Sequence, residues 1–481
     1  MLLRHTLLYL PAQVLGPLMQ FVAIFAWAWW LSPRDMGAFT IIAATQELGY
    51  LLFLSWFSAY ALRFHRRDSD DDADAYRAAE TVVLAAAGAL NFLLALVTVT
   101  LVLDEPPGAE MVMAAGLFMS ARSLGAHMAE RARAAERIAA YTILQVSGPA
   151  LGLLLGLALR PLVTLDAAWA LALYALGHGL SIAVAAPMIG MRARPPREAA
   201  PVLGKALAYG LPLLLAGGFS WVALNAVRYV TESFEGLAAA GLIAVGLGLG
   251  QRGAAFAAMF VTAAAFPLAV KAQRESGEAA AMRQLMLGGA LLIAALAPAA
   301  AGLLAINGDI SRLLVKESYA AITLAVLPWA VVMGVARNLR SHFPDQVFLL
   351  AARPRVVTLI DAVDGGLTLL GAIAGIMMRG APGAVAGAAM GAIAAAAFSF
   401  ALAAREKHFA FPWSHALRAI AASLLMLAAL LVMPAAAGIW QLLLKVVLAA
   451  AIYAVALAAL YPAEIRKAIK SPGMILSGKP E

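Results

Sequence analysis

The sequence predicts an all-α polytopic membrane protein with about fourteen transmembrane helices. Its 481 residues are 63% apolar and only 13% charged, whereas about 25% of residues are charged in a soluble domain. Many separate apolar runs reach about 20 residues, which is the length of helix that crosses a bilayer core. The stretches between these runs are short, so no soluble domain is expected.

The predicted spans follow one another along the chain. The first is too long for the core of a signal peptide and lacks a small-residue cleavage site, so we interpret it as a retained helix. In order, the spans cover residues 7–31, 36–62, 77–102, 111–131, 137–159, 163–190, 204–227, 237–268, 284–306, 319–340, 356–378, 383–404, 416–434 and 438–461.

Lysines and arginines collect on one side of the predicted membrane. The side that bears the N-terminus holds 26 of them and the opposite side holds 6. By the positive-inside rule, and with an even number of spans, both termini are expected in the cytoplasm. This placement accounts for the net charge of +8 without a nucleic acid partner. Three basic residues lie deep inside spans and are counted on neither side, namely Arg122, Arg252 and Lys445.

A short pattern occurs twice, 215 residues apart, and each copy follows an apolar run. Both copies place an arginine near hydrocarbon depth, where a charge costs roughly 2.5–3.5 kcal/mol on insertion scales. Duplicated polytopic folds with buried charges are usually transporters. Pro344 has no counterpart in the first copy and predicts a kink in the second. The copies are Ala121-Arg122-x-Leu124-x-x-His127-x-x-Glu130 and Ala336-Arg337-x-Leu339-x-x-His342-x-x-Asp345.

The repeat extends to the helix hairpins that contain Gly37 and Gly241, which lie 204 residues apart. The repeating unit is therefore about six helices long. Because six is even, both units enter the membrane from the same side, and we expect a pseudo-two-fold axis along the membrane normal to relate them. We predict six-helix bundles over residues 1–198 and 199–410, followed by helices 13 and 14 and a cytoplasmic tail over 411–481.

Three segments carry a resemblance to a known family. They are WLSPRDMGAF at residues 30–39, WFSAYALRF at 56–64 and YGLPLL at 209–214. They resemble the first hairpin, the end of the second helix and the start of the seventh helix of bacterial polysaccharide and O-antigen flippases. These flippases belong to the multidrug/oligosaccharidyl-lipid/polysaccharide (MOP) exporter superfamily. The resemblance covers most of the first twelve spans.

The resemblance implies alternating-access flipping of a polyprenyl-diphosphate-linked oligosaccharide, from the cytoplasmic to the periplasmic leaflet of the bacterial inner membrane. It implies a monomer that works with membrane lipids and with other polysaccharide-assembly proteins. The energy source is left open among an ion gradient, with H⁺ or Na⁺ as the coupling ion, the membrane potential and downstream consumption of the product. The first span has no interior arginine, which favours an exopolysaccharide or O-antigen substrate. The alternatives are a multidrug (MATE-like) exporter and a peptidoglycan lipid II-type exporter of the same superfamily.

Four arginines are the candidate substrate-binding residues, because a guanidinium binds phosphate oxygens bidentately and keeps its charge when desolvated. Arg122 and Arg337 are expected to face each other from opposite bundles and to grip the diphosphate. Arg252 is expected to bind phosphate near the midplane, and Arg228 to assist an outward-facing sugar or gate. The alternative is that these side chains snorkel to the interface or neutralise helix C-termini.

Glu47 is a candidate gate or coupling residue. It lies 10 residues after Gly37, and Arg252 lies 11 residues after Gly241, so we expect the two charges at equal depth as an ion pair between the bundles. Glu47 is also a candidate for protonation during transport, because isolated intramembrane charges are usually functional. The alternative is that each charge is satisfied by polar neighbours in its own bundle.

Two further pairs are candidate gate residues near the cytoplasmic mouth. His127 and Glu130, like His342 and Asp345, are three residues apart on a helix, so each pair shares a face. The alternative is a solvated helix end with ordinary ion pairing.

The sequence predicts no catalytic residue, metal site or cofactor. It contains no cysteine, and it lacks the GxxxxGK[ST] loop that binds nucleotide phosphates. A membrane glycan polymerase or ligase commonly needs sizeable loops that carry acids or bases, and the outer loops here are short. The sequence therefore favours a secondary transporter over an enzyme.

Overall fold

A computed structural model describes residues 2–64, 70–103, 108–195 and 199–461. Within these ranges the chain is helical and contains no strand, which confirms the predicted all-α class. The elements are α1 (Leu2–Trp30), α2 (Pro33–Tyr50), η1 (Leu51–Ser55), α3 (Trp56–Phe64), α4 (Asp70–Val102), α5 (Ala109–Ala134), α6 (Ile138–Thr142), η2 (Ile143–Ser147), α7 (Gly148–Leu159), α8 (Ala167–Met188), α9 (Ala199–Ser276), α10 (Glu278–Ala305), α11 (Asn307–Leu313), α12 (Glu317–His342), α13 (Pro344–Leu350), α14 (Pro354–Ala403), α15 (Trp413–Leu431) and α16 (Ile439–Ala459). The segments η1 and η2 are π-helical.

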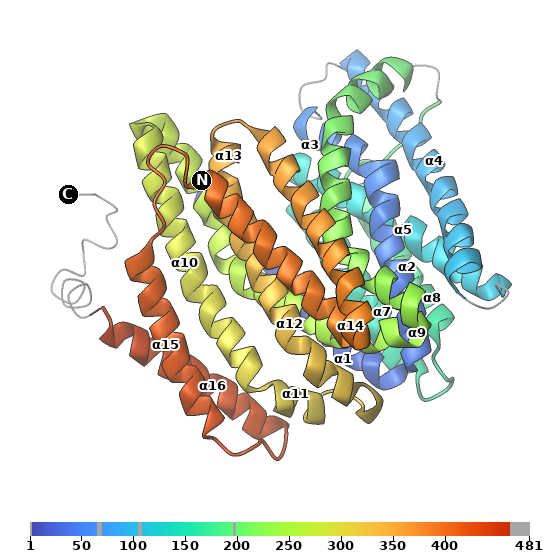
Figure 1. Cartoon of the computed structure of the whole chain (residues 1–481). Coiled ribbons are helices and arrows are strands. Elements are labelled where there is room, and N and C mark those ends of the chain that lie inside the picture. The colour runs from blue at the N-terminus through green and yellow to red at the C-terminus, as the bar shows by residue number, and fades with distance from the viewer. Residues whose placement is uncertain (1, 65–69, 104–107, 196–198, 462–481) are drawn as a thin grey trace. The chain divides into compact units, whose positions relative to one another are not determined.

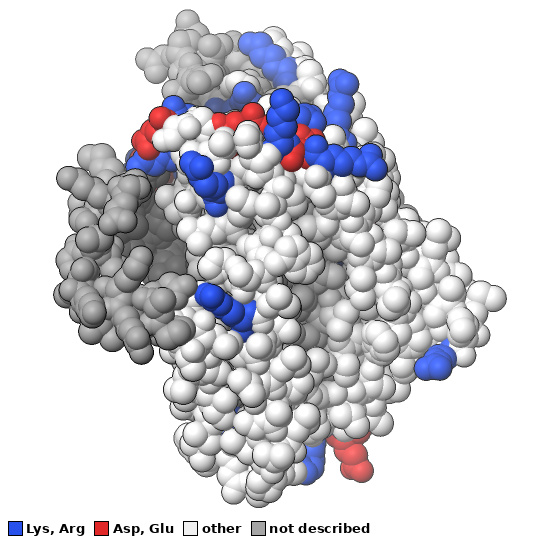
Figure 2. All heavy atoms as spheres, turned by 60° about the vertical axis from the view of Figure 1, so that its left-hand side comes forward, with Lys and Arg blue, Asp and Glu red and all other residues white. Residues whose placement is uncertain are grey.

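Ten helices in the described part of the chain are long and apolar enough to cross a membrane. Two of them, α9 and α14, are long enough to cross twice, with 78 and 50 residues. With these two second crossings the ten helices give twelve spans, and α1 and α5 lie where the other two of the fourteen are predicted. The face drawn in Figure 2 is mostly uncharged, and most of its charged side chains lie near the top, with a few others at mid-face and near the bottom. The protein is a multi-pass integral membrane protein.

The two longest helices are each interrupted where a predicted loop separates two spans. In α9 the interruption is Gly236, with φ 81° and ψ 176°. In α14 it is Arg379 and Gly380, and Gly380 has φ 65° and ψ −158°. This region of positive φ is open essentially only to glycine. The chain therefore reverses at these two glycines without a longer loop.

The two arms of α14 pack against each other with their backbones in contact. A Cβ added to Gly371 would overlap the carbonyl of Gly387, and one added to Gly375 would overlap the carbonyl of Gly383. Small residues at such spacing let membrane helices approach closely without a hydrophobic driving force. This contact holds the second arm antiparallel to the first.

The chain divides into two compact units. The first comprises Met1–Leu249, Lys316–Val326 and Arg355–Ala395, and the second comprises Gly250–Val315, Leu327–Pro354 and Ala396–Glu481. In the first unit, α5 packs against α2, α4 and α8, and α7 packs against α8. In the second, α15 and α16, drawn in red, lie beside α10 (Figure 1). The division into six-helix bundles at residues 198 and 410 stays a prediction.

Gly37 and Gly241, which mark the repeat in the sequence, are in direct contact within the first unit. A Cβ on Gly37 would overlap the carbonyl oxygen of Leu237, and one on Gly241 would overlap that of Pro33. The first turns of α2 and the helix after Gly236 therefore cross at backbone distance. Only glycine fits at this crossing.

Alanine at Gly37 or Gly241 is expected to reduce the free energy of unfolding by about 2 kcal/mol or more, because overpacking forces the two backbones apart. Gly218→Ala is the matched control on α9, because its added Cβ meets no neighbouring atom within 4 Å. This control should be neutral or slightly stabilising. Thermal unfolding in detergent compares these variants with the control. Equal unfolding midpoints would contradict a backbone contact at Gly37 and Gly241.

A buried ion pair attaches the last two helices to the rest of the second unit. Lys445 on α16 donates a hydrogen bond of 2.6 Å to Asp309 Oδ2 on α11. The other oxygen, Oδ1, accepts from the Ala436 amide at 2.9 Å and from Arg312 at 3.0 Å. Burial opposes the charged carboxylate, but these hydrogen bonds and positive charges outweigh it and lower the pKa of Asp309. Lys445, one of the three intramembrane basic residues, therefore has a structural partner.

Because the pKa of Asp309 is lower in the folded state, its ion pair should stabilise the protein above about pH 4 and lose its effect as pH falls through the lowered pKa. We expect Asp309→Asn to unfold at a lower temperature than wild type at neutral pH, with the difference shrinking toward pH 3. The exposed Glu278→Gln is the control. A difference in unfolding temperature between wild type and Asp309→Asn that does not change with pH would contradict a stabilising role of the Asp309 charge.

Candidate functional site

Glu47 and Arg122 meet at the middle of two membrane helices. Glu47 lies halfway along the span Pro33–Phe64, and Arg122 lies at the centre of α5. Arg122 Nη2 is 3.5 Å from Glu47 Oε1, and the two side chains are 32% and 48% exposed. A charge at this depth normally faces the protein interior or a water-filled cavity rather than lipid. The pair therefore indicates a polar, water-accessible surface at mid-depth of the first unit.

Asn225 extends this pair to Arg228, which is also a predicted site residue. Asn225 Nδ2 donates to Glu47 Oε2 at 3.4 Å. Arg228 Nη1 donates to Asn225 Oδ1 at 2.7 Å and to the Leu224 carbonyl at 3.1 Å. Two predicted arginines and the predicted carboxylate therefore form one continuous polar chain, which we call the Glu47 network (Arg122, Glu47, Asn225 and Arg228).

Neighbouring aromatic residues of α9 and α5 position the Glu47 network. Trp221 Nε1 donates to the Ala44 carbonyl at 2.9 Å. The Tyr229 hydroxyl lies 2.7 Å from the Thr45 hydroxyl. The Arg122 guanidinium lies over the Phe118 ring, 5.8 Å from its centroid. The first two contacts tie α9 to α2 just before Glu47, on both sides of Asn225, and in the third the Phe118 ring lies against the Arg122 guanidinium.

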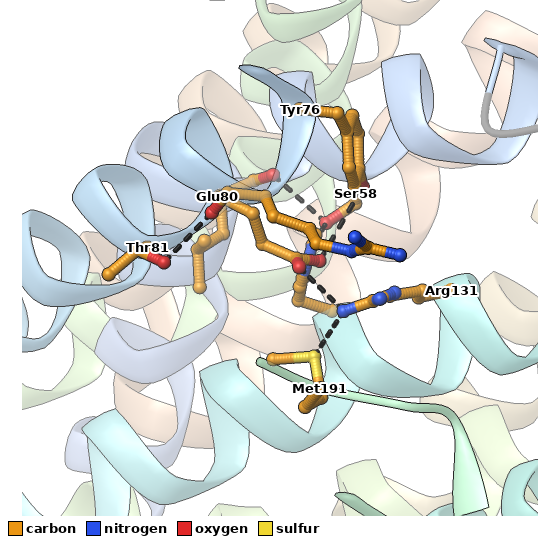
Figure 3. Close-up of polar contacts among 9 residues, drawn as sticks. Ser58, Tyr76, Glu80, Thr81, Arg131 and Met191 are labelled. Carbon is orange, nitrogen blue, oxygen red and sulfur yellow. Dashed lines mark hydrogen bonds and ion pairs between the residues drawn. The ribbon is translucent and has the colours of Figure 1, made fainter. Parts of the chain in front are cut away.

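A second polar cluster is fully buried and contains only one predicted residue, His127. Its Nε2 is 3.1 Å from Glu80 Oε1, and Arg131 Nη1 is 2.5 Å from Glu80 Oε2. Its Nδ1 is 2.9 Å from the Ser58 hydroxyl. Figure 3 shows Ser58, Glu80 and Arg131 converging from α3, α4 and α5. The sequence signal that could have found Glu80 is a lone carboxylate inside the predicted span 77–102.

Glu130 does not share the contacts of His127, although the two lie on one face of α5. Glu130 pairs with Arg133 at 2.6 Å, and both side chains are partly exposed. The first copy of the repeated pattern therefore divides its polar residues between an accessible pair and a buried cluster.

The second copy of the pattern is arranged differently. Helix α12 ends at His342 and α13 begins at Pro344, which confirms the predicted kink. Asp345 is buried, accepts a hydrogen bond of 2.5 Å from Ser399, and lies 3.4 Å from Arg340 Nε. Arg337 is also buried, whereas His342 is half-buried.

Arg252 is exposed on the part of α9 that belongs to the second unit. Glu47 and Arg122 belong to the first unit, and Arg337 to the second. The expected Glu47–Arg252 pair and the facing of Arg122 and Arg337 therefore stay predictions. Among the described residues, no group of three or more His, Asp or Glu side chains could hold a metal ion.

Solved structures with the same helical arrangement are known, although no family model and no curated protein matches the sequence. An inward-facing multidrug MATE transporter of the MOP superfamily matches with a TM-score of 0.60 and 13% identity, over 83% of this chain and 97% of its own. The Vibrio cholerae MATE transporter VcmN matches with a TM-score of 0.54 and 16% identity, over 84% and 96%. The chain has the fold of the MOP exporters.

Within that fold, the lipid II flippase MurJ in an inward closed conformation matches with a TM-score of 0.77 and 10% identity. This match covers 95% of the present chain and 100% of MurJ. The uncovered 5% is about 24 residues, fewer than the 47 from Trp413 to Ala459 that form α15 and α16. The MurJ match therefore extends into the C-terminal helix pair, which the sequence predicts as an addition to the repeat.

Glu80→Gln is expected to reduce the free energy of unfolding by about 3–5 kcal/mol, because it leaves the buried Arg131 charge without its carboxylate. The matched control is Glu130→Gln on the partly exposed pair with Arg133, which should change stability by only about 0–1 kcal/mol. Thermal unfolding of the purified variants compares the two. A similar loss of unfolding free energy in the two variants would show that Arg131 does not depend on Glu80 as a buried partner.

Proposed function

We propose that the chain is a flippase that moves a polyprenyl-diphosphate-linked oligosaccharide from the cytoplasmic to the periplasmic leaflet of the bacterial inner membrane, for exopolysaccharide or O-antigen assembly. The exporter fold supports a transporter. The observation that carries the proposal is the accessible Arg122–Glu47 pair at the middle of the membrane helices. A group that binds an anion during transport must be reachable from water at this depth.

The geometry of the pair supports exchange of its partner. Arg122 and Glu47 are 3.5 Å apart and partly exposed, whereas Arg131 and Glu80 are 2.5 Å apart and buried. A loose, hydrated ion pair contributes little to stability, so a competing anion displaces it at small cost. A diphosphate offers several oxygens to the planar guanidinium of Arg122 and forms stronger, charge-assisted hydrogen bonds.

Asn225 and Arg228 give Glu47 an alternative partner during this exchange. When Arg122 turns to the diphosphate, Glu47 keeps the Asn225 hydrogen bond, and Asn225 in turn holds Arg228. Arg228 then offsets part of the carboxylate charge through a neutral amide. We assign Arg122 the diphosphate, Glu47 the role of exchangeable counter-ion, and Arg228 a supporting positive charge.

The remaining predicted residues complete the proposed transport cycle. Arg252 and Arg337 provide further phosphate contacts from the second bundle. His127, Glu130, His342 and Asp345 form gate contacts near the cytoplasmic side. The cycle is alternating access between the predicted bundles of a monomer whose termini are cytoplasmic, and H⁺ or Na⁺ is the candidate coupling ion. The sugar stays in the wet interior and the lipid tail in the bilayer, which avoids dragging polar groups through hydrocarbon.

Two other substrates are favoured by specific observations. The MurJ match extends into the C-terminal helix pair, which favours a lipid II-type substrate. Glu47 is more exposed than Arg122, at 48% against 32%, which favours a cationic drug as in a multidrug exporter. The three candidates differ in the charge and glycan of the cargo, so one reconstituted assay distinguishes them.

Arg122→Ala should reduce the flipping rate about tenfold or more, because a hydrogen bond to a charged group contributes about 1.5–3 kcal/mol. Flipping is measured in liposomes as loss of outer-leaflet accessibility of a fluorescent polyprenyl-diphosphate oligosaccharide. Arg228→Ala should have a smaller effect in the same direction. Arg274→Ala, at an exposed position in the last turn of α9, is the control.

The same liposomes separate the candidate substrates. A flippase for polysaccharide assembly should move the oligosaccharide carrier faster than lipid II, and should not export an organic cation. Transport of the cation that depends on Glu47 but not on Arg122 would establish the multidrug alternative. Unchanged flipping in Arg122→Ala would overturn the proposed binding role.

A further inference from the structure

We propose that the buried cluster of Ser58, His127 and Glu80 binds a single proton, and that this proton controls the π-helical segment η1. Nothing in the Glu47 network requires this cluster, which lies on separate side chains of α3, α4 and α5. The link to transport rests on the proposed function, but the proton site itself does not.

His127 has both ring nitrogens in hydrogen-bond contact and no exposed surface. Nδ1 is 2.9 Å from the Ser58 hydroxyl, and Nε2 is 3.1 Å from Glu80 Oε1. A neutral imidazole has one N–H and one bare nitrogen, whereas a carboxylate only accepts. The positions of the protons on His127 therefore depend on which group accepts the hydroxyl proton of Ser58.

Ser58 has one hydroxyl proton, and His127 Nδ1, the Leu54 carbonyl and the Tyr50 hydroxyl all lie within its reach. Besides His127 Nδ1, its oxygen lies 3.0 Å from the Leu54 carbonyl. If Ser58 donates to Nδ1, the neutral ring carries its proton on Nε2 and donates it to Glu80. If Ser58 donates to Leu54, then Nδ1 must carry a proton to donate to Ser58. In that case a further proton must lie between Nε2 and Glu80, because two bare acceptors would otherwise face each other at 3.1 Å.

The cluster therefore has two complete hydrogen-bond arrangements that differ by one proton. In the first, Glu80 and Arg131 cancel and His127 is neutral, so the net charge is zero. In the second, one proton has been taken up and the net charge is +1. A switch between them rotates the Ser58 hydroxyl from the histidine to the helix backbone.

Three charged groups on α5 surround the cluster. Glu130 interacts electrostatically with His127. Arg131 contacts Glu80 directly, and Arg133 pairs with Glu130. Two phenols also face the cluster, from the Tyr50 side chain near Ser58 and from Tyr76 at 3.5 Å from Glu80 Oε1.

Leu54 connects the proton to the helix that carries Glu47. Its carbonyl belongs to η1, the five-residue π-helical segment Leu51–Ser55 between α2 and α3. Such segments are rare and occur frequently at functional sites. Glu47 lies one turn before η1, so a hydrogen bond made or lost at Leu54 acts on the helix just beyond the Glu47 network. Proton binding is therefore expected to stabilise the π-helical form.

The experiment uses the full-length protein in lipid nanodiscs without substrate, between about pH 5 and 8. Nitrogen-15 NMR of labelled histidine reports the protonation of His127, whose signal is identified among the seven histidines by its loss in His127→Gln. Nδ1 should change from unprotonated to protonated as pH falls. Amide hydrogen exchange of residues 51–58, corrected for the intrinsic effect of pH, should show about fivefold greater protection at low pH, as expected for one additional hydrogen bond.

Ser58→Ala separates the proton site from its connection to η1. This variant should still protonate His127 but should lose the pH dependence of protection, and the exposed His415→Gln should behave as wild type. A His127 Nδ1 that does not change, or a wild-type pH dependence in Ser58→Ala, would overturn the proposal. Because neither measurement involves a substrate, a failure of flipping in liposomes would leave this result unaffected.

Discussion

Charge inside an apolar bundle is the constraint on which the rest of the structure depends. A charged side chain in a membrane helix must have a partner in the protein or face water, since lipid offers neither. The first unit satisfies this in two ways. Glu80 and Arg131 are buried together with His127, whereas Glu47 and Arg122 are paired loosely and remain accessible. The buried charges stabilise the fold, whereas the accessible pair is available to a ligand.

The buried cluster and the Glu47 network lie on the same helices. Ser58 and Glu47 belong to one continuous span, interrupted only by η1, and both Arg122 and His127 are on α5. A change in the buried cluster therefore reaches the accessible network through two backbones. This arrangement allows a site deep in the protein to influence a site that faces water without direct contact between them. The second unit uses its buried charge differently, because Asp309 and Lys445 attach a helix pair.

The fold could be predicted from the sequence because length and apolarity identify membrane helices one at a time. Even the interruptions at Gly236 and Gly380 fall in predicted loops. The candidate residues Glu47, Arg122 and Arg228 could also be found individually, as charges in apolar surroundings. Their contacts could not, because no spacing in the sequence marks Arg122 and Asn225 as neighbours of Glu47. The expected pair of Glu47 with Arg252 stays a prediction. Pairing depends on how helices rotate and pack, which periodicity does not encode.

Glycine contacts in α14 have a consequence for how the protein is made. The second arm, from Gly383 to Ala403, consists largely of alanine and glycine, which partition only weakly into lipid. Its backbone lies directly against the first arm at Gly371 and Gly375. We therefore expect the ribosome-bound translocon to release both arms together as one hairpin, because the second arm gains most of its stability in the bilayer from the first. The glycines at these positions then contribute to membrane insertion of the second arm.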